Sequence, residues 1–292
     1  MNAASALRLI LLAAIWGASF LFMRVSVPAL GPVIPAVGRI VVGAVFLALV
    51  ALLLRRVALQ RAHWRHYLIL GLFNTALPFL CYGFAARQLT ASVMSILNAT
   101  APIWGALVAA VWLGVKPTLK SACGLLLGVV GVTVLVGLDA ATSQPGAGWA
   151  IMAVLSATLC YAIASSYSKR HAADVPPFAA AHGSMWAASF TILPLLAWQP
   201  APVVPTPLAV CAVLALGVFC TGMAYLLYFR LVQDIGPASA LTVTFLIPVF
   251  GVLWGVLLLG ETIGHNTLAG AALVLVGTAL ATGFDPRRVW RG

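Results

Sequence analysis

The sequence repeats itself at a constant shift of 146 residues, and this duplication limits the possible folds more than any other feature. Shared Leu and Ala would arise by chance in an apolar chain, but glycines, prolines and a loop aspartate in register would not. The chain is therefore a tandem duplication, with a first repeat over 1–138, a linker over 139–147 and a second repeat over 148–292. The matching pairs are Gly71 and Gly217, Thr75 and Thr221, Tyr82 and Tyr228, Pro102 and Pro248, Gly114 and Gly260, Gly124 and Gly270, Gly131 and Gly277, and Asp139 and Asp285.

The composition places both repeats in a membrane. The chain has 292 residues, of which 63% are hydrophobic and only 7% charged, whereas about a quarter of the residues in a soluble domain are charged. Apolar stretches of about 18 to 22 residues, each long enough to cross a bilayer as a helix, recur along the chain. This predicts an all-α integral membrane protein with ten spans, five per repeat: 8–27, 33–54, 67–86, 91–113, 120–138, 148–168, 178–198, 208–230, 238–259 and 267–284.

An odd number of spans per repeat makes the second repeat enter the membrane from the side opposite to the first. The prediction is therefore two inverted five-helix repeats, an arrangement found in many secondary transporters. Arg24, Arg39 and Arg87 fall towards one face, and the other basic residues fall towards the opposite face, so both termini should be cytoplasmic. That second group is Arg8, Arg55, Arg56, Arg61, Arg65, Lys116, Lys120, Lys169, Arg170, Arg230, Arg287, Arg288 and Arg291.

The formal net charge of +11 is spread over short connections and forms no basic domain. We interpret it as topology and contact with anionic membrane lipid, and we expect no nucleic-acid partner. The first span resembles a signal peptide, but Ser19 and Arg24 match Ser165 and Arg170 at the shift of 146, which favours a retained helix. The five cysteines fall inside spans without metal-type spacing, so we expect free thiols, no metal site and no cofactor.

Prolines and glycines within the spans are candidates for hinges and packing faces. Pro102 and Pro248 are repeat mates, and together with Pro78 they are the candidate gating positions, since a proline frees a backbone carbonyl. A static kink relieved by packing is the alternative. Glycines of the fifth and tenth spans let helices approach closely, either inside the molecule or in a dimer. We therefore expect a monomer or a weak homodimer.

Polar and aromatic side chains recur at helical spacings of three and four residues, on faces that must avoid lipid. An amide such as that of Asn98 has too many donors and acceptors for its own backbone to satisfy. For the hydroxyl groups, a bond to their own helix is the alternative, and for the aromatic rings it is core packing. The predicted substrate-binding residues are Trp16, Ser19, Phe20, Asn74, Tyr82, Ser95, Asn98, Trp104, Tyr161, Ser165, Thr221, Tyr225, Thr242 and Phe245.

All five acidic residues fall at or beyond span ends: Asp139, Asp174, Asp234, Glu261 and Asp285. A carrier driven by protons usually needs a titratable group within the bilayer, so coupling through a buried carboxylate is not expected. An organic cation would also find no counter-ion. A neutral or zwitterionic solute fits better, with its carboxylate bound by Arg24 or Arg39 near the outer ends of spans 1 and 2, or by the amides of a half-helix.

Several motifs resemble the EamA type of the drug/metabolite transporter superfamily. They are the run from Ile15 to Phe20 in the first span, the run from Asn98 to Pro102 in the fourth, and the runs Pro248 to Gly251 and Leu259 to Glu261 in the ninth. Within the family the chain is most similar to bacterial aromatic amino-acid exporters of the YddG kind. The first repeat departs from the paired pattern, because Val115 stands where its mate is Glu261.

The resemblance implies an inner-membrane carrier of small metabolites. Its central cavity would be lined mainly by spans 1, 3, 4, 6, 8 and 9, with spans 5 and 10 at the periphery. We expect a secondary exporter of neutral or aromatic amino acids that works by alternating access. Export of another metabolite or of a drug is the alternative, and a channel would also be compatible with these helices. A membrane-embedded enzyme is disfavoured, because no nucleophile with its base and no metal motif occurs.

Overall fold

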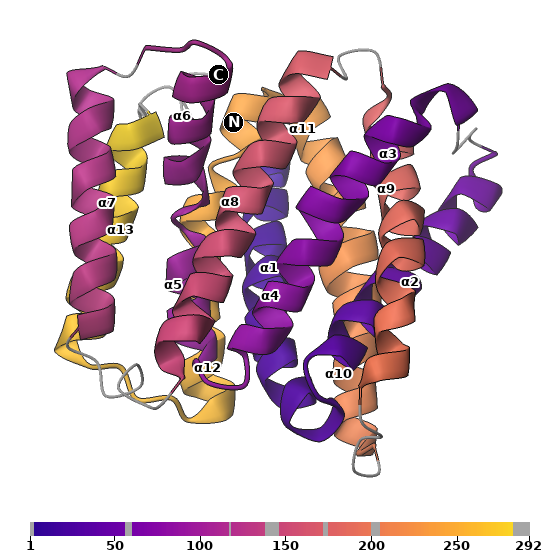
Figure 1. Ribbon diagram of the computed structural model, residues 1–292, viewed down its shortest axis with the longest axis horizontal. Helices are drawn as coiled ribbons and strands as arrows, with labels where there is room; N and C mark the ends of the chain where they lie inside the picture. Colours follow the sequence, from indigo (N-terminus) through magenta and orange to yellow (C-terminus); the bar gives the residue numbers. More distant parts are fainter. Residues whose placement is uncertain are drawn as a thin grey trace.

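The structure, a computed structural model, describes residues 3–55, 60–116, 118–137, 146–171, 175–199 and 205–282. Within these ranges the chain is helical apart from short turns and contains no strand, which confirms the predicted all-α class (Figure 1). Most of the predicted linker and Asp139, Asp174 and Asp285 lie outside the described residues. The helices are α1 (Ala3–Leu30), α2 (Val33–Leu53), α3 (Trp64–Gly71), α4 (Leu77–Ala85), α5 (Ala91–Asn98), α6 (Ala101–Trp112), α7 (Leu119–Gly137), α8 (Ala147–His171), α9 (Pro177–Ile192), α10 (Pro207–Gly217), α11 (Ala224–Ala240), α12 (Val243–Leu259) and α13 (His265–Thr282).

The helices fit a multi-pass membrane protein. Seven helical stretches of the described chain are long and apolar enough to cross a bilayer, and two further apolar helices, Leu119–Leu135 and Val243–Leu259, are shorter. The predicted seventh span divides into α9 and the 3₁₀ segment Leu193–Trp198. A turn at Leu241 and Thr242 shortens the predicted ninth span. The count of ten spans therefore stays a prediction, since turns interrupt several apolar stretches.

Local sequence signals account for several helix ends. Gly114 and Gly260 follow the fourth and ninth predicted spans and have φ angles of 67° and 65°, a left-handed conformation that favours glycine. Helices α5 and α10 each begin after a threonine: the hydroxyls of Thr90 and Thr206 each accept a backbone N–H three residues later, at 3.2 Å. The repeated glycines therefore correspond to repeated helix ends.

The helices of the two repeats interleave. Helix α1 packs against α10, α11 and α12, all from the second repeat, whereas α8 packs against α3, α4 and α6 of the first. These two sets correspond at the shift of 146 residues. In Figure 1, α1 runs away from the end of the bundle that carries the N-terminus, and α8 runs towards it. Each repeat therefore supplies helices that the other needs for its packing.

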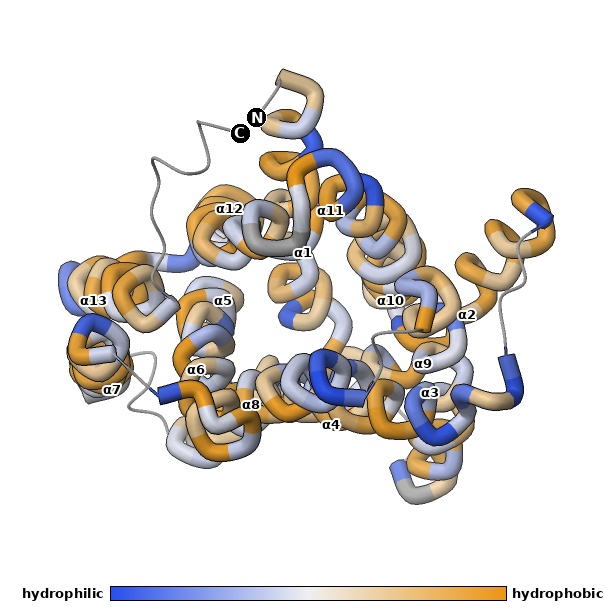
Figure 2. The backbone as a smooth tube through the Cα atoms, turned by 90° about the horizontal axis from the view of Figure 1, so that it is seen from above, coloured by the Kyte–Doolittle hydropathy of each residue, from blue (hydrophilic) through white to orange (hydrophobic). Residues whose placement is uncertain are grey.

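Helices α7 and α13 pack together at one edge of the bundle, as Figures 1 and 2 both show. Glycines make this contact close: a Cβ added to Gly277 would lie 2.5 Å from the Gly128 nitrogen, and one at Gly131 would lie 2.7 Å from the Val274 nitrogen. This confirms the packing interpretation of these glycine faces. The close contact is internal, which leaves these glycines unavailable for a dimer.

Candidate functional site

A cavity of about 1090 Å³ lies between the helices of both repeats. Helices α1, α2, α4, α6, α8, α11 and α12 contribute side chains to it, together with the ends of α5, α7 and α13. In the view along the bundle, α1, α4, α5, α8 and α11 lie around a common centre, whereas α7 and α13 lie at one edge (Figure 2). Twelve predicted substrate-binding residues line the cavity: Trp16, Ser19, Phe20, Asn74, Tyr82, Asn98, Tyr161, Ser165, Thr221, Tyr225, Thr242 and Phe245.

Five other predicted functional residues lie outside the cavity lining, in contrast to Pro102, which lines it. Ser95 is fully buried and donates its hydroxyl to the Ser92 carbonyl at 2.8 Å. Trp104 lies on α6 outside the lining. The remaining three are Pro78 at the start of α4, Pro248 within α12, and Arg24, which donates to a backbone carbonyl.

Arg39, a predicted contact for a substrate carboxylate, lies deeper in the bundle than its position in the sequence suggested. It was expected near the outer end of span 2, but it lies at the cavity and is only 6% exposed. Its Nε donates to the hydroxyl oxygen of Thr221 at 2.9 Å and its Nη2 to the Cys220 carbonyl at 3.4 Å. The guanidinium carbon also lies 3.7 Å from the centroid of the Phe79 ring. The charged guanidinium is therefore buried in the bundle, and the groups that it contacts there are neutral.

The cavity wall also presents aromatic rings. The Tyr82 hydroxyl donates to Asn98 Oδ1 at 2.6 Å, which connects α4 to the end of α5. The Phe20 ring meets Tyr82 edge to face with centroids 5.5 Å apart, and the Tyr161 ring stacks with Tyr82 at 6.5 Å. Such rings favour contact with another aromatic ring and form a surface suited to an aromatic ligand.

Two π-helical segments, Leu72–Ala76 and Val218–Met223, occupy the same place in the two repeats. Each bulge redirects side chains in the middle of an apolar stretch, and such bulges frequently occur at functional sites. The first contains Asn74, whose amide donates to the Tyr225 hydroxyl at 3.3 Å. The second contains Thr221, the partner of Arg39. The duplicated backbone irregularity thus positions polar groups from both repeats at one cavity.

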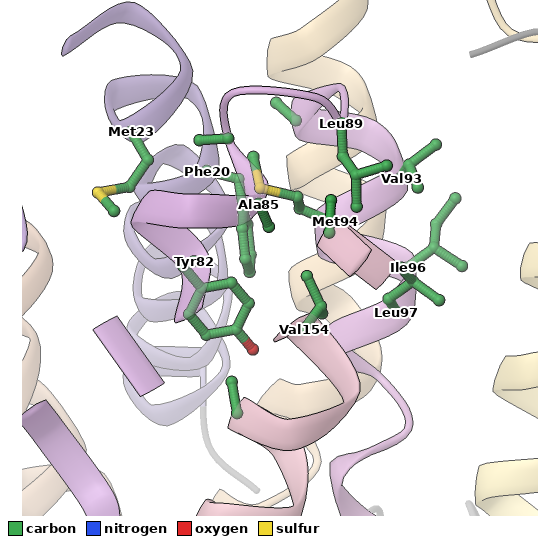
Figure 3. Close-up of a cluster of buried hydrophobic side chains, with 14 of the residues drawn as sticks. Phe20, Met23, Tyr82, Ala85, Leu89, Val93, Met94, Ile96, Leu97 and Val154 are labelled. Carbon is green, nitrogen blue, oxygen red and sulfur yellow. The ribbon is translucent and has the colours of Figure 1, made fainter. Parts of the chain in front are cut away.

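One end of the bundle is closed beneath the cavity. Phe20 and Tyr82 line the cavity and belong to a buried apolar cluster that includes Met94 and Leu97 (Figure 3). This cluster fills the space between α1, α4 and α5 with aliphatic side chains. Apolar packing of this kind excludes water and solute from that end.

Polar contacts reinforce the same end. Glu261 Oε1 accepts the Ala91 N–H at 2.7 Å, and its Oε2 accepts the Ser92 N–H at 3.0 Å and the Ser92 hydroxyl at 2.5 Å. The carboxylate therefore caps α5 from the other repeat, where helix N–H groups lack partners. Arg24 donates to the Ala86 carbonyl at 2.7 Å, in the connection that precedes α5.

The opposite end of the cavity is open. Val115, Lys116 and Thr118 line the cavity and are exposed, as is Leu241 at the junction of α11 and α12. Gly105 of α6 also lines the cavity, and a Cβ added to it would meet no atom within 4 Å. The cavity therefore extends from these exposed lining residues to the buried side chains of Arg39 and Tyr82.

Sequence reasoning missed several lining residues. Phe79 lies three residues before Tyr82 on the same helical face, and this spacing could have found it. Cys220 is a free and buried thiol, as expected for the cysteines, but it also lines the cavity, and its sulfur donates to the Ile15 carbonyl at 3.2 Å. No helical spacing could have identified Lys116, because it lies in the loop between α6 and α7 and reaches the cavity only in the folded protein.

The profile of the EamA-like transporter family matches residues 4–137 and again residues 148–283. The uncharacterized transporter YoaV of Bacillus subtilis (strain 168) is 26% identical over 280 residues, covering 94% of this chain and 95% of its own. A probable terminal-alkyne amino-acid exporter of Streptantibioticus cattleyicolor is 24% identical over 284 residues, covering 93% and 91%. A solved crystal structure superimposes with a TM-score of 0.68 at 21% identity, covering 99% of both chains, which supports the fold.

These matches span nearly the whole chain, and the family profile recognises each repeat separately. The similar proteins are transporters by name, in agreement with a chain whose central cavity opens to one side. The protein belongs to the EamA-like transporter family, within the drug/metabolite transporter superfamily.

Proposed function

We propose that the protein is a secondary carrier that exports small metabolites across the cytoplasmic membrane, with aromatic amino acids as its substrates. The observation that carries this proposal is the pairing of a buried guanidinium, that of Arg39, with the aromatic wall formed by Phe20, Tyr82 and Tyr161. A carboxylate on the substrate would meet Arg39, and its ring would meet the wall. The amino-acid exporter among the similar proteins supports this class of substrate.

The mechanism we propose is alternating access by two inverted five-helix repeats with cytoplasmic termini and ten spans. The opposite directions of α1 and α8 support the inversion. Arg8, Lys116 and Arg230 belong to the open end of the bundle, and Arg24 and Arg87 to the other, so the positive-inside rule makes the open end cytoplasmic. The protein would thus take up its substrate from the cytoplasm. We further propose contact with anionic lipid and a monomer or weak homodimer.

Uptake into liposomes that contain the purified protein tests this function. Labelled tryptophan, phenylalanine, threonine and a cationic dye would be offered with and without an imposed pH gradient. We expect saturable uptake of the aromatic amino acids without a gradient, and stimulation by unlabelled substrate on the far side. Uptake that does not saturate would identify a channel, and dye movement that follows the proton gradient would identify a drug exporter instead.

A further inference from the structure

The guanidinium of Arg39 has hydrogen-bonding capacity that the protein does not use. A guanidinium has five N–H donors, and the described residues accept from its Nε and Nη2 only. Nη1 makes no hydrogen bond within the described part of the chain, while Arg39 lines the cavity. The unused donors are available to a planar, doubly accepting anion such as a carboxylate.

Among the described residues, the charge of Arg39 also has no acidic partner. Asp234 pairs with Arg8 at 2.6 Å and Arg230 at 3.1 Å, and Glu261 caps α5. No Asp or Glu is among the described side chains that line the cavity. A buried charge without a counter-ion is costly, so a bound anion at Arg39 would be stabilised by compensating it.

A second cation lies at the mouth of the cavity. Lys116 lines the opening and is exposed to the solvent. Two positive charges of one cavity, one at the entrance and one at depth, attract anions towards the interior and repel cations. Among the described residues, both formal charges that line the cavity are therefore positive.

The described residues that line the cavity offer no counter-ion for the α-ammonium group of an amino acid. The hydroxyls of Ser165 and Thr242, which donate to backbone carbonyls, and Asn98 Oδ1, which accepts from Tyr82, can offer an ammonium only neutral acceptors. An ammonium could lie over an aromatic ring, but Arg39 would repel it from the same region. Arg39 can therefore bind the carboxylate of a substrate, whereas the described lining residues provide no anionic partner for its amino group.

We propose that the cavity selects aromatic organic anions: one carboxylate for Arg39 and one ring for the aromatic wall, with no requirement for an α-amino group. Aryl-substituted carboxylic, 2-hydroxy and 2-oxo acids are then recognised as well as aromatic amino acids. Aromatic amines and amides are excluded. This inference rests on the proposed function, because it assigns the substrate class of the same cavity.

The test compares ligands with one ring and different charged groups on the purified full-length protein. Phenyllactate, 3-phenylpropionate, phenylalaninamide and phenethylamine would compete with labelled phenylalanine in liposomes, and each would be tested for raising the thermal denaturation midpoint in detergent. We expect the two acids to inhibit about as strongly as phenylalanine. The amide and the amine should be about tenfold weaker or more, because they lose a charge-assisted hydrogen bond.

Variants assign this preference to one side chain. Arg39→Gln should reduce inhibition by the acids about tenfold and leave the amide unaffected, while Arg39→Lys should retain part of the preference. Arg65→Gln, which removes an exposed cation outside the cavity lining, is the matched control and should keep the wild-type ratio. The ligand series on the wild-type protein decides the matter even if an Arg39 variant does not fold.

The outcomes separate this proposal from the proposed function. Equal inhibition by the amide and the acids would overturn the proposed preference for anions. The proposed transport of amino acids would not be affected by that result. Stabilisation by the acids, lost in Arg39→Gln, would uphold the anion class even if labelled phenylalanine were not transported, and would overturn the amino-acid assignment alone. An unchanged ratio of acid to amide inhibition in a folded Arg39→Gln protein would overturn the role of Arg39.

Discussion

At the residue scale, a hydrogen bond from the Tyr82 hydroxyl connects the aromatic wall of the cavity to the side-chain amide of Asn98. This bond to Asn98 Oδ1 fixes both the ring of Tyr82 and the end of α5, where the chain turns before α6. Both residues line the cavity. This 2.6 Å hydrogen bond therefore helps to hold the ring on which a ligand would stack.

Tyr82→Phe tests this contact, since it keeps the ring and removes the hydroxyl. We expect the KM for an aromatic substrate to rise about two- to tenfold, the range that follows from one lost hydrogen bond. Uptake into liposomes measures it. Tyr167→Phe is the control, because that ring stacks on His66 and does not line the cavity. An unchanged KM in Tyr82→Phe would remove Tyr82 from the substrate site.

At the element scale, Glu261 connects the two repeats at the closed end. The carboxylate lies beyond α12 and accepts three hydrogen bonds at the start of α5. Its acceptors replace the carbonyl partners that the first N–H groups of a helix lack. The sequence shows an acid at a span end, whereas the structure gives this acid a capping role between repeats.

We predict that stability falls in the order wild type, Glu261→Gln, Glu261→Ala. Glutamine keeps one acceptor oxygen, and alanine keeps none, so the loss for alanine should be about 1 to 2 kcal/mol, as for other helix caps. The thermal denaturation midpoint in detergent measures the order. Equal midpoints for all three proteins would show that the cap does not stabilise the closed end.

The contact between α7 and α13 is a second element-scale feature that can be tested. Gly131→Ala places a methyl group 2.7 Å from the Val274 nitrogen, so it should separate the helices and destabilise the fold by about 1 to 3 kcal/mol. Gly148→Ala is the matched control, because its Cβ meets no atom within 4 Å. The denaturation midpoint should fall for the first variant only, and a fall in both would indicate a general cost of alanine.

At the scale of the whole molecule, the proposed topology of five spans per repeat would make the connection between the repeats emerge opposite to both termini. A phosphatase fused after Gln88 should be active, and one fused after Lys116 inactive, because alkaline phosphatase folds only outside the cytoplasm. Activity assays on cells expressing each fusion measure this. The reverse pattern would invert the proposed orientation and place the open end of the cavity outside.

The sequence by itself determined the membrane class, the all-α fold and the duplication. Each depends on features that do not require a fold: apolar length, few charges, and glycines and prolines in register. It also identified twelve of the polar and aromatic residues that line the cavity, because such residues at helical spacing avoid lipid. Tyr82 and Asn98 were found in this way and proved to be bonded to each other.

Only the tertiary structure decided which faces meet. Nearly every side of these helices is apolar, so the sequence does not reveal their rotation, and Ser95 and Trp104 were placed on a cavity that they do not line. Arg39 was expected at a span end, but the packing of α2 against the π-helical segment of Thr221 brings it to the cavity. A charge inside a membrane protein depends on partners far away in sequence, and these become visible only when the helices are assembled.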